Sequence, residues 1–222
     1  MIRTFSPLDV PTRLCSPLFR AVSLMMMLMM MLALPASLAR ADARIDAANA
    51  VITAMASDMD SYLANDAGDA SARLTTVTRM LDTYFDLPTI ARFSVGPYWR
   101  AASNEERQIY NDTLRLTMIG TVVNNFDQLK GLTFTPTDSL PKGDNIVLVR
   151  GHFSDKSGQR TPVMVGWRVI TPDDGTAKIL DVEIENISML VTQQQENLAI
   201  IRQNQGRFSA LIEAMKAKQT TK

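Results

Sequence analysis

The spacing of apolar residues divides the chain into helical and extended segments. Apolar positions recur about every 3.6 residues over residues 45–63 and again over residues 70–84, which predicts two amphipathic helices. A shorter helix is expected to begin near Pro88, because proline is favoured in a first helical turn, and Gly96-Pro97 ends it. The first third of the domain is therefore predicted to be helical.

A longer helix is predicted to begin at Ser103. Ser103 and Glu106 have the spacing of a capping box, in which each side chain binds the backbone N–H group of the other residue. Gly131 is a suitable C-cap, and Gly120 is a point at which the helix could bend or split. One face of this helix carries the apolar residues Tyr110, Leu114, Met118, Val122, Phe126 and Leu129.

Beyond Gly131 the hydrophobic period falls to two, which predicts β-strands. Pro136 either ends the first strand or marks it as an edge strand, because proline cannot donate a hydrogen bond to a neighbouring strand. Short polar loops separate the strands, and this favours an antiparallel meander. The four expected strands cover residues 132–135, 145–153, 161–170 and 177–184.

Helical spacing returns after the strands. It begins at Ile187, is interrupted at residues 205–207 and resumes at Phe208. The order of the elements predicts an α+β fold, with a four-stranded antiparallel sheet packed on one face by N- and C-terminal helices. These elements are expected to form one domain over residues 42–222, which is long enough to bury a sizeable core.

The fourth strand has two chemically different faces. Leu180, Val182 and Ile184 alternate with the carboxylates Asp181, Glu183 and Glu185. Two carboxylates on one strand face could flank a scissile bond or a cation. The favoured interpretation is a solvated sheet face, which is common in antiparallel sheets, with the three apolar side chains facing the helices.

The start of the chain differs in composition from the rest. Residues 1–20 contain three arginines and one acidic residue, and residues 21–34 form an uncharged apolar run. Ala39 and Ala41 then have the spacing of an A-x-A cleavage site, so residues 1–41 are predicted to be a cleavable secretory signal peptide. The apolar run is short for a membrane span, which needs about 20 residues, and an uncleaved N-terminal anchor is the alternative.

Composition removes several classes of function. Positions 1–41 hold four of the 23 basic and one of the 23 acidic residues, so residues 42–222 carry 19 basic and 22 acidic residues. This balance gives no support for a nucleic-acid partner. The only cysteine, Cys15, lies in the predicted signal peptide, and the only histidine, His152, is expected on a strand near solvent. We therefore predict no catalytic site, no metal site and no cofactor.

Three segments of the sequence together resemble one family. Residues 85–107 pair Phe-Asp with a short helix, a glycine, an aromatic–basic pair and an S-x-x-E-R helix start. Residues 180–190, LDVEIENISML, and residues 202–212, with the pattern R-x₃-G-x₄-L-I, follow in order. This combination is similar to MlaC-like proteins, also called the toluene-tolerance family, over about residues 43–216.

The resemblance implies a soluble, non-enzymatic periplasmic carrier that holds phospholipid acyl chains in an apolar cavity between sheet and helices. It also implies two partners, an outer-membrane lipoprotein complex and an inner-membrane ABC transporter complex. The lipid-binding residues expected on this basis lie on the sheet and on the long helix: Val147, Val149, Val165, Trp167, Val182 and Ile184, with Tyr110, Leu114, Met118, Val122 and Phe126.

Alternatives to a phospholipid carrier stay open at the level of sequence. Asn186 stands where the family usually has glycine, which leaves open the hopanoid-associated branch, called HpnM, and with it a hopanoid-type lipid. An enzyme of similar fold would need Asp181 or Glu183 to point inward beside another polar group. A closed structural adaptor of an envelope complex would have a filled core and no ligand.

Overall fold

The structure is a computed structural model that describes residues 34–65, 68–155, 157–172 and 176–220. The chain divides into two compact units, Met1–Asp42 and Ala43–Lys222, and the sheet, its packing and the pockets belong to the second unit. Most of the predicted signal peptide lies outside the described residues, and its cleavage stays a prediction.

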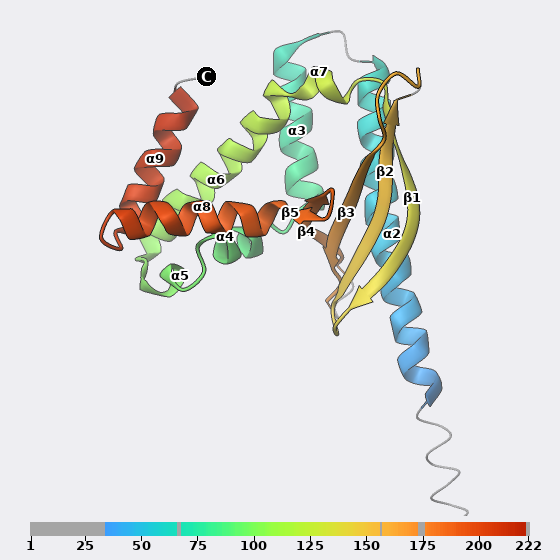
Figure 1. Cartoon of the computed structure of the whole chain (residues 1–222), viewed down its shortest axis with the longest axis horizontal. Coiled ribbons are helices and arrows are strands. Elements are labelled where there is room, and N and C mark those ends of the chain that lie inside the picture. The colour runs from blue at the N-terminus through green and yellow to red at the C-terminus, as the bar shows by residue number, and fades with distance from the viewer. Residues whose placement is uncertain (1–33, 66–67, 156, 173–175, 221–222) are drawn as a thin grey trace, which may run out of the picture. The chain divides into compact units, whose positions relative to one another are not determined.

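Helices precede and follow the strands, as the hydrophobic spacing predicts (Figure 1). Within the described ranges no helix combines the length and hydropathy needed to cross a membrane. The helices before the strands are α2 (Leu34–Asn65), α3 (Ala70–Tyr84), α4 (Leu87–Val95), α5 (Tyr98–Ala101), α6 (Asn104–Asn124) and α7 (Phe126–Leu129). The helices after them are α8 (Met189–Gln203) and α9 (Phe208–Thr220).

The local signals for helix ends act as expected at most positions. Ser103 and Glu106 form the capping box that begins α6. Asp86, which precedes Pro88, caps α4 by accepting a hydrogen bond from the backbone N–H of Thr89 at 3.1 Å. The long helical pattern is split at Asn125 rather than at Gly120, so α6 and α7 are separate helices.

The sheet is an antiparallel meander in the order β1-β2-β3-β4-β5, and it has five strands where four were expected. Pro136 lies within β1, which pairs with β2, and the register shifts between Pro136 and Asp138. The proline is therefore accommodated in an edge strand at an irregularity and does not end the strand. The strands are β1 (Leu132–Lys142), β2 (Ile146–Asp155), β3 (Val163–Ile170), β4 (Lys178–Ile184) and β5 (Ile187–Ser188).

The fifth strand, β5, corrects the prediction that helical spacing begins at Ile187. Ile187 pairs with Ile184 across a two-residue connection, Glu185-Asn186. Both connecting residues have positive φ, 50° and 64°, which is the conformation of a type I′ hairpin turn. The helix α8 therefore begins two residues later, after Ser188.

A register shift in β4 also changes the predicted alternation. Trp167 of β3 lies opposite Val182 of β4, and Val169 lies opposite Ile179. The two β3 residues are two positions apart in sequence, whereas their β4 partners are three positions apart, so β4 contains one extra residue. Ile179 thus joins the apolar sheet face, and Leu180 packs instead among α4, α6, α8 and α9. The expectation that Leu180 shares a face with Val182 is wrong, because periodicity alone does not reveal a bulge.

The helices cover the sheet unequally. Side chains of α2 and α3 pack on the sheet face that carries Val147, Val165 and Trp167. The C-terminal helices α8 and α9 pack mainly with α4 and α6, and this cluster meets the sheet at Leu180 (Figure 1). The apolar sheet face is therefore covered by N-terminal helices, where helices from both ends had been expected.

Candidate functional site

A pocket of about 910 Å³ lies between the N-terminal helices and the apolar face of the sheet. On the helical side its wall contains Ile52, Met55, Met59 and Leu63 of α2, Val77, Met80 and Leu81 of α3, Val122 of α6 and Leu129 of α7. On the sheet side it contains Leu132, Phe134, Phe153, Val163, Val165, Trp167, Val182 and Ile184. The core between these layers is thus hollow, which periodicity could not show.

Three aromatic rings form one side of the pocket. The ring of Phe134 lies 5.3 Å from that of Phe153 and 6.0 Å from that of Trp167, centre to centre. Gly151 makes this arrangement possible, since a Cβ atom there would lie 2.5 Å from the Phe134 ring. The aromatic wall therefore depends on a glycine in the neighbouring strand.

The opposing wall is held together by a polar contact between α2 and α3. Asp58 of α2 accepts hydrogen bonds from Arg79 at 3.0 Å and from the Tyr84 hydroxyl at 2.9 Å, both from α3. The Arg79 hydrogen bond, aided by Tyr84, lowers the pKa of Asp58, while partial burial and the Asp58 carboxylate raise the pKa of Tyr84. The carboxylate thus fixes the two helices that face the sheet.

Polar residues are confined to one part of the pocket wall. They come from the end of α2, the end of α6, α7 and the loop between β2 and β3, and all are exposed. Arg160 of this loop donates a hydrogen bond to the carbonyl of Gln128 in α7 at 2.9 Å. The polar rim, as we call this set, consists of Asp60, Thr121, Asn125, Gln128, Arg160 and Thr161.

Five of the eleven residues expected to bind lipid line this pocket. They are Val122, Val165, Trp167, Val182 and Ile184. The four sheet residues among them follow from strand alternation, since they pair across β3 and β4. Their role in binding lipid stays a prediction.

The other six expected residues do not line this pocket. Val147 and Val149 are buried on the same sheet face among the α2–sheet contacts. Tyr110 and Leu114 of α6 belong to the buried cluster that α4, α6, α8 and α9 form. Phe126 belongs to the cluster of α3, α6 and α7, and the half-buried Met118 packs against both clusters. Only the C-terminal end of α6 reaches the pocket, which a uniform apolar face could not reveal.

The residues of α2 and α3 that line the pocket were not among the eleven residues expected to bind lipid. Their apolar stripes were recognised, for example at Ile52, Met55 and Met80, but a stripe does not show what it faces. Three of these wall residues, Met55, Met59 and Met80, have flexible side chains that adapt to ligands of different shape.

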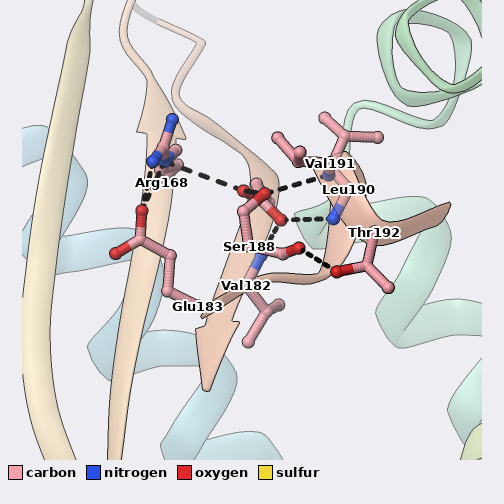
Figure 2. A network of polar contacts seen from close by, with 8 residues as sticks. Arg168, Val182, Glu183, Ser188, Leu190, Val191 and Thr192 are labelled. Carbon is pink, nitrogen blue, oxygen red and sulfur yellow. Dashed lines mark hydrogen bonds and ion pairs between the residues drawn. The ribbon is translucent and has the colours of Figure 1, made fainter. Parts of the chain in front are cut away.

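The carboxylates of β4 lie away from this pocket and are not solvated as expected. Asp181 is 5% exposed and Glu183 is 9% exposed, which contradicts the expected wet sheet face; Glu185 is exposed. Arg168 of β3 donates a 2.8 Å hydrogen bond to Glu183 and lies 3.7 Å from Asp181 (Figure 2). Asp181 is covered by the start of α8, to which it is hydrogen-bonded, and Glu183 is engaged by Arg168.

Asp181 joins the sheet to α8. It accepts hydrogen bonds from the backbone N–H of Leu190 at 2.9 Å and from the Ser188 hydroxyl at 2.5 Å (Figure 2). Ser188 in turn caps α8 by accepting a hydrogen bond from the N–H of Val191 at 3.0 Å. Its contacts make Asp181 a structural residue, and it has no place in the pocket wall.

Metal-binding clusters are absent from the described part of the chain. No group of three or more His, Cys, Asp or Glu side chains there could hold a metal ion. His152 is half-buried on β2. The dominant feature is thus an apolar pocket with a polar rim.

Comparison with known proteins identifies similar chains. The family model described as MlaC protein matches residues 47–217. Among solved structures, a phospholipid-binding protein from Ralstonia solanacearum, determined in complex with a phospholipid, aligns with a TM-score of 0.66 and 21% sequence identity. The alignment covers 78% of this chain and 97% of that one, and at this identity it shows a common fold. A search of curated proteins found no significant match.

Proposed function

Because this chain belongs to the MlaC family, we propose that it is a carrier that holds the acyl chains of a phospholipid in the apolar pocket. The observation that carries the proposal is the division of the pocket into an apolar interior and the polar rim. A phospholipid has the same division, with apolar chains and a hydrated headgroup. The phospholipid bound to the similar Ralstonia protein supports this class of ligand.

The energetics of the pocket suit a carrier. Transfer of each CH₂ group from water to an apolar site contributes about 0.8 kcal/mol, so ten buried groups contribute about 8 kcal/mol before the costs of association. Those costs are offset by further methylenes, and a pocket of about 910 Å³ has the size of known ligand sites. Binding therefore requires apolar surface and no reactive group.

The polar rim is suited to the phospholipid headgroup. It contains one cation, Arg160, whose guanidinium can pair with a phosphate, one carboxylate, Asp60, and four uncharged hydrogen-bonding side chains. Because all of these residues are exposed, a headgroup beside them keeps its contact with water. The lipid would therefore enter with its chains toward Phe134 and Trp167.

A binding and transport role fits the polar chemistry better than catalysis does. The enzyme alternative required Asp181 or Glu183 to face the pocket, and both are engaged by Arg168 or the start of α8. A carrier releases the lipid unchanged, so it needs only a pocket whose helices can part.

The site of action is proposed to be the periplasm. The predicted signal peptide at residues 1–41 supports export. Family membership supports shuttling between an outer-membrane lipoprotein complex and the complex of an inner-membrane ABC transporter. These two complexes are the partners we propose.

A vesicle assay tests the carrier function. Donor vesicles contain a fluorescent phospholipid with a quencher, acceptor vesicles contain neither, and the chain without residues 1–41 is added. We expect the rate of fluorescence recovery to rise in proportion to protein concentration. A rate equal to that without protein, from a chain that is folded by circular dichroism, would contradict the proposal.

A further inference from the structure

A second, smaller cavity adjoins the main pocket at Phe85. It has a volume of about 290 Å³ and lies among residues at or just after the end of α3, at the start of α4 and in the middle of α6. Phe85 lines both cavities. The other residues of this second chamber are Asp82, Leu87, Pro88, Asn111, Asp112, Leu114 and Arg115.

The backbone around Phe85 is fixed on both sides. The N–H of Phe85 donates a hydrogen bond to Leu81 at 3.0 Å, which ends α3. The N–H of Asp86 donates one to Ile179 of β4 at 2.9 Å, and Phe85 forms a bridge with the same strand residue. The segment between α3 and α4 is thus attached to the sheet, and the position of the aromatic ring is restricted.

The ring of Phe85 lies where the apolar clusters of the domain meet. It packs against the α2–sheet cluster, against the cluster of α4, α6, α8 and α9, and against the smaller cluster of α3, α6 and α7. Contacts in three directions hold a side chain in one rotamer. The side chain therefore lies at the boundary of the two cavities.

Phe85 stands away from the polar rim. Figure 1 shows α3 running from the level of α7, which carries part of the rim, toward β4 and β5, and Phe85 follows the last residue of α3. An acyl chain that enters past the rim and runs along α3 would meet the Phe85 ring. Phe85 is also one of the residues that line the second chamber.

The chemistry of the second chamber differs from that of the pocket. Asp82 and Arg115 form an ion pair there with two hydrogen bonds of 2.8 and 2.5 Å, which satisfies both charges. Asn111 has a buried amide oxygen that lacks a hydrogen-bond partner among the described residues, so the chamber can hold water. Leu87, Pro88 and Leu114 give it an apolar side that could take the end of an acyl chain.

We propose that Phe85 is the residue that limits the length of the acyl chains this protein binds. The inference rests on the proposed lipid-binding function and adds to it a determinant of specificity. In the wild type the aromatic ring ends the accessible path and keeps acyl chains out of the second chamber. A smaller residue would join the two cavities and extend the path by the length of the chamber.

The test compares bound lipids in three variants. Phe85→Leu and Phe85→Ala remove the aromatic ring, and Phe153→Ala is the matched control, because Phe153 lines the main pocket but is not among the residues of the second chamber. Each protein is incubated with an equimolar mixture of phosphatidylcholines of increasing chain length, and bound lipids are quantified by mass spectrometry. We expect the two Phe85 variants to shift toward longer chains relative to both the wild type and Phe153→Ala.

Photo-crosslinking locates the chain end and gives a readout on the wild type itself. A phosphatidylcholine with a diazirine at the chain terminus is bound and irradiated, and tryptic peptides are analysed. We expect adducts on peptide 108–115, which contains four residues of the second chamber, in Phe85→Leu but not in the wild type.

The outcomes separate this inference from the proposed function. Adducts on peptide 108–115 in the wild type, or equal chain-length profiles in wild type and Phe85→Leu while both bind lipid, would overturn the role of Phe85. A wild-type protein that binds no lipid at all would instead overturn the proposed function on which the inference rests. If Phe85→Ala fails to fold, the more conservative Phe85→Leu and the wild-type crosslinking still decide the question.

Discussion

Asp181 shows how a single residue can differ from its sequence pattern. The alternation of β4 places it on a polar face, and it is instead buried by α8 and bonded to Leu190, Ser188 and Val182. The register shift near Leu180 and the packing of α8 both involve distant segments. Neither is encoded in the local period of two, so the residue type could be noticed but its role could not.

Asp181→Ala should destabilise the domain. It leaves the N–H of Leu190 and the hydroxyl of Ser188 without their acceptor beside a buried sheet edge, which costs about 2–4 kcal/mol of the free energy of unfolding. Urea denaturation of the wild type and the variant measures this difference in the free energy of unfolding. The control Glu196→Ala, at an exposed position of α8, should change stability by less than about 0.5 kcal/mol, and equal effects would contradict the structural role.

The raised pKa of Tyr110 predicts that the free energy of unfolding depends on pH in the alkaline range. Burial raises the pKa of Tyr110 to about 12 from its ordinary value of 10.0, despite the opposing hydrogen bonds of Ser94 and Asn197. Since the folded pKa is raised, the unfolded chain loses this proton first. The stability contributed by the neutral phenol is therefore complete below pH 10 and is lost as the pH rises toward 12.

The measurement compares wild type with Tyr110→Phe. Between pH 9 and pH 11 the wild type should lose about 1.3 kcal/mol more unfolding free energy than the variant does. The variant lacks the titrating hydroxyl, so changes from other groups cancel in the difference. Parallel pH profiles for the two proteins would show that Tyr110 titrates as in the unfolded chain.

At the scale of elements, local signals were sufficient where the backbone itself enforces the structure. The capping box at Ser103 and the break at residues 205–207 are properties of short segments, and both are found. The strand β5 was missed because its connection, Glu185-Asn186, lacks the glycine that usually marks a type I′ turn. Asparagine at the second position was the one available signal.

The positive φ of Asn186 predicts that substitution by valine and by glycine will affect stability differently. Its φ of 64° lies in the left-handed region, which asparagine and glycine tolerate and β-branched residues do not. Asn186→Val should lower the unfolding free energy by about 1–2 kcal/mol, whereas Asn186→Gly should change it little. Thermal unfolding of both variants checks this, and an equally stable Asn186→Val would argue against the I′ turn.

At the scale of the whole molecule, the sequence could not distinguish a closed core from a pocket. The strand face that carries Val147, Val165, Trp167 and Val182 was identified from its alternation alone. Which of these residues border empty space depends on how far α2 and α3 stand from the sheet, and that distance is set by packing across the whole domain. The fold class therefore followed from the pattern, and the pocket required the structure.

A pair of valines tests whether the interior is open. Val182 lines the pocket and is half-buried, so Val182→Glu should leave the chain folded and greatly reduce lipid binding, since a carboxylate would replace part of the apolar wall. Val147 is fully buried in the closed core, so Val147→Glu should unfold the domain. Circular dichroism and lipid binding are measured on both. Unfolding by both substitutions would indicate a closed core at Val182.

The central claim is that the pocket carries phospholipid, and native mass spectrometry tests it most directly. The protein is purified from cells without added lipid and sprayed under non-denaturing conditions. We predict a stoichiometric adduct with the mass of a phospholipid, which is released on activation and identified by fragmentation. An adduct with the mass of a hopanoid would replace the proposed ligand class, and a folded protein that is free of lipid would contradict the account.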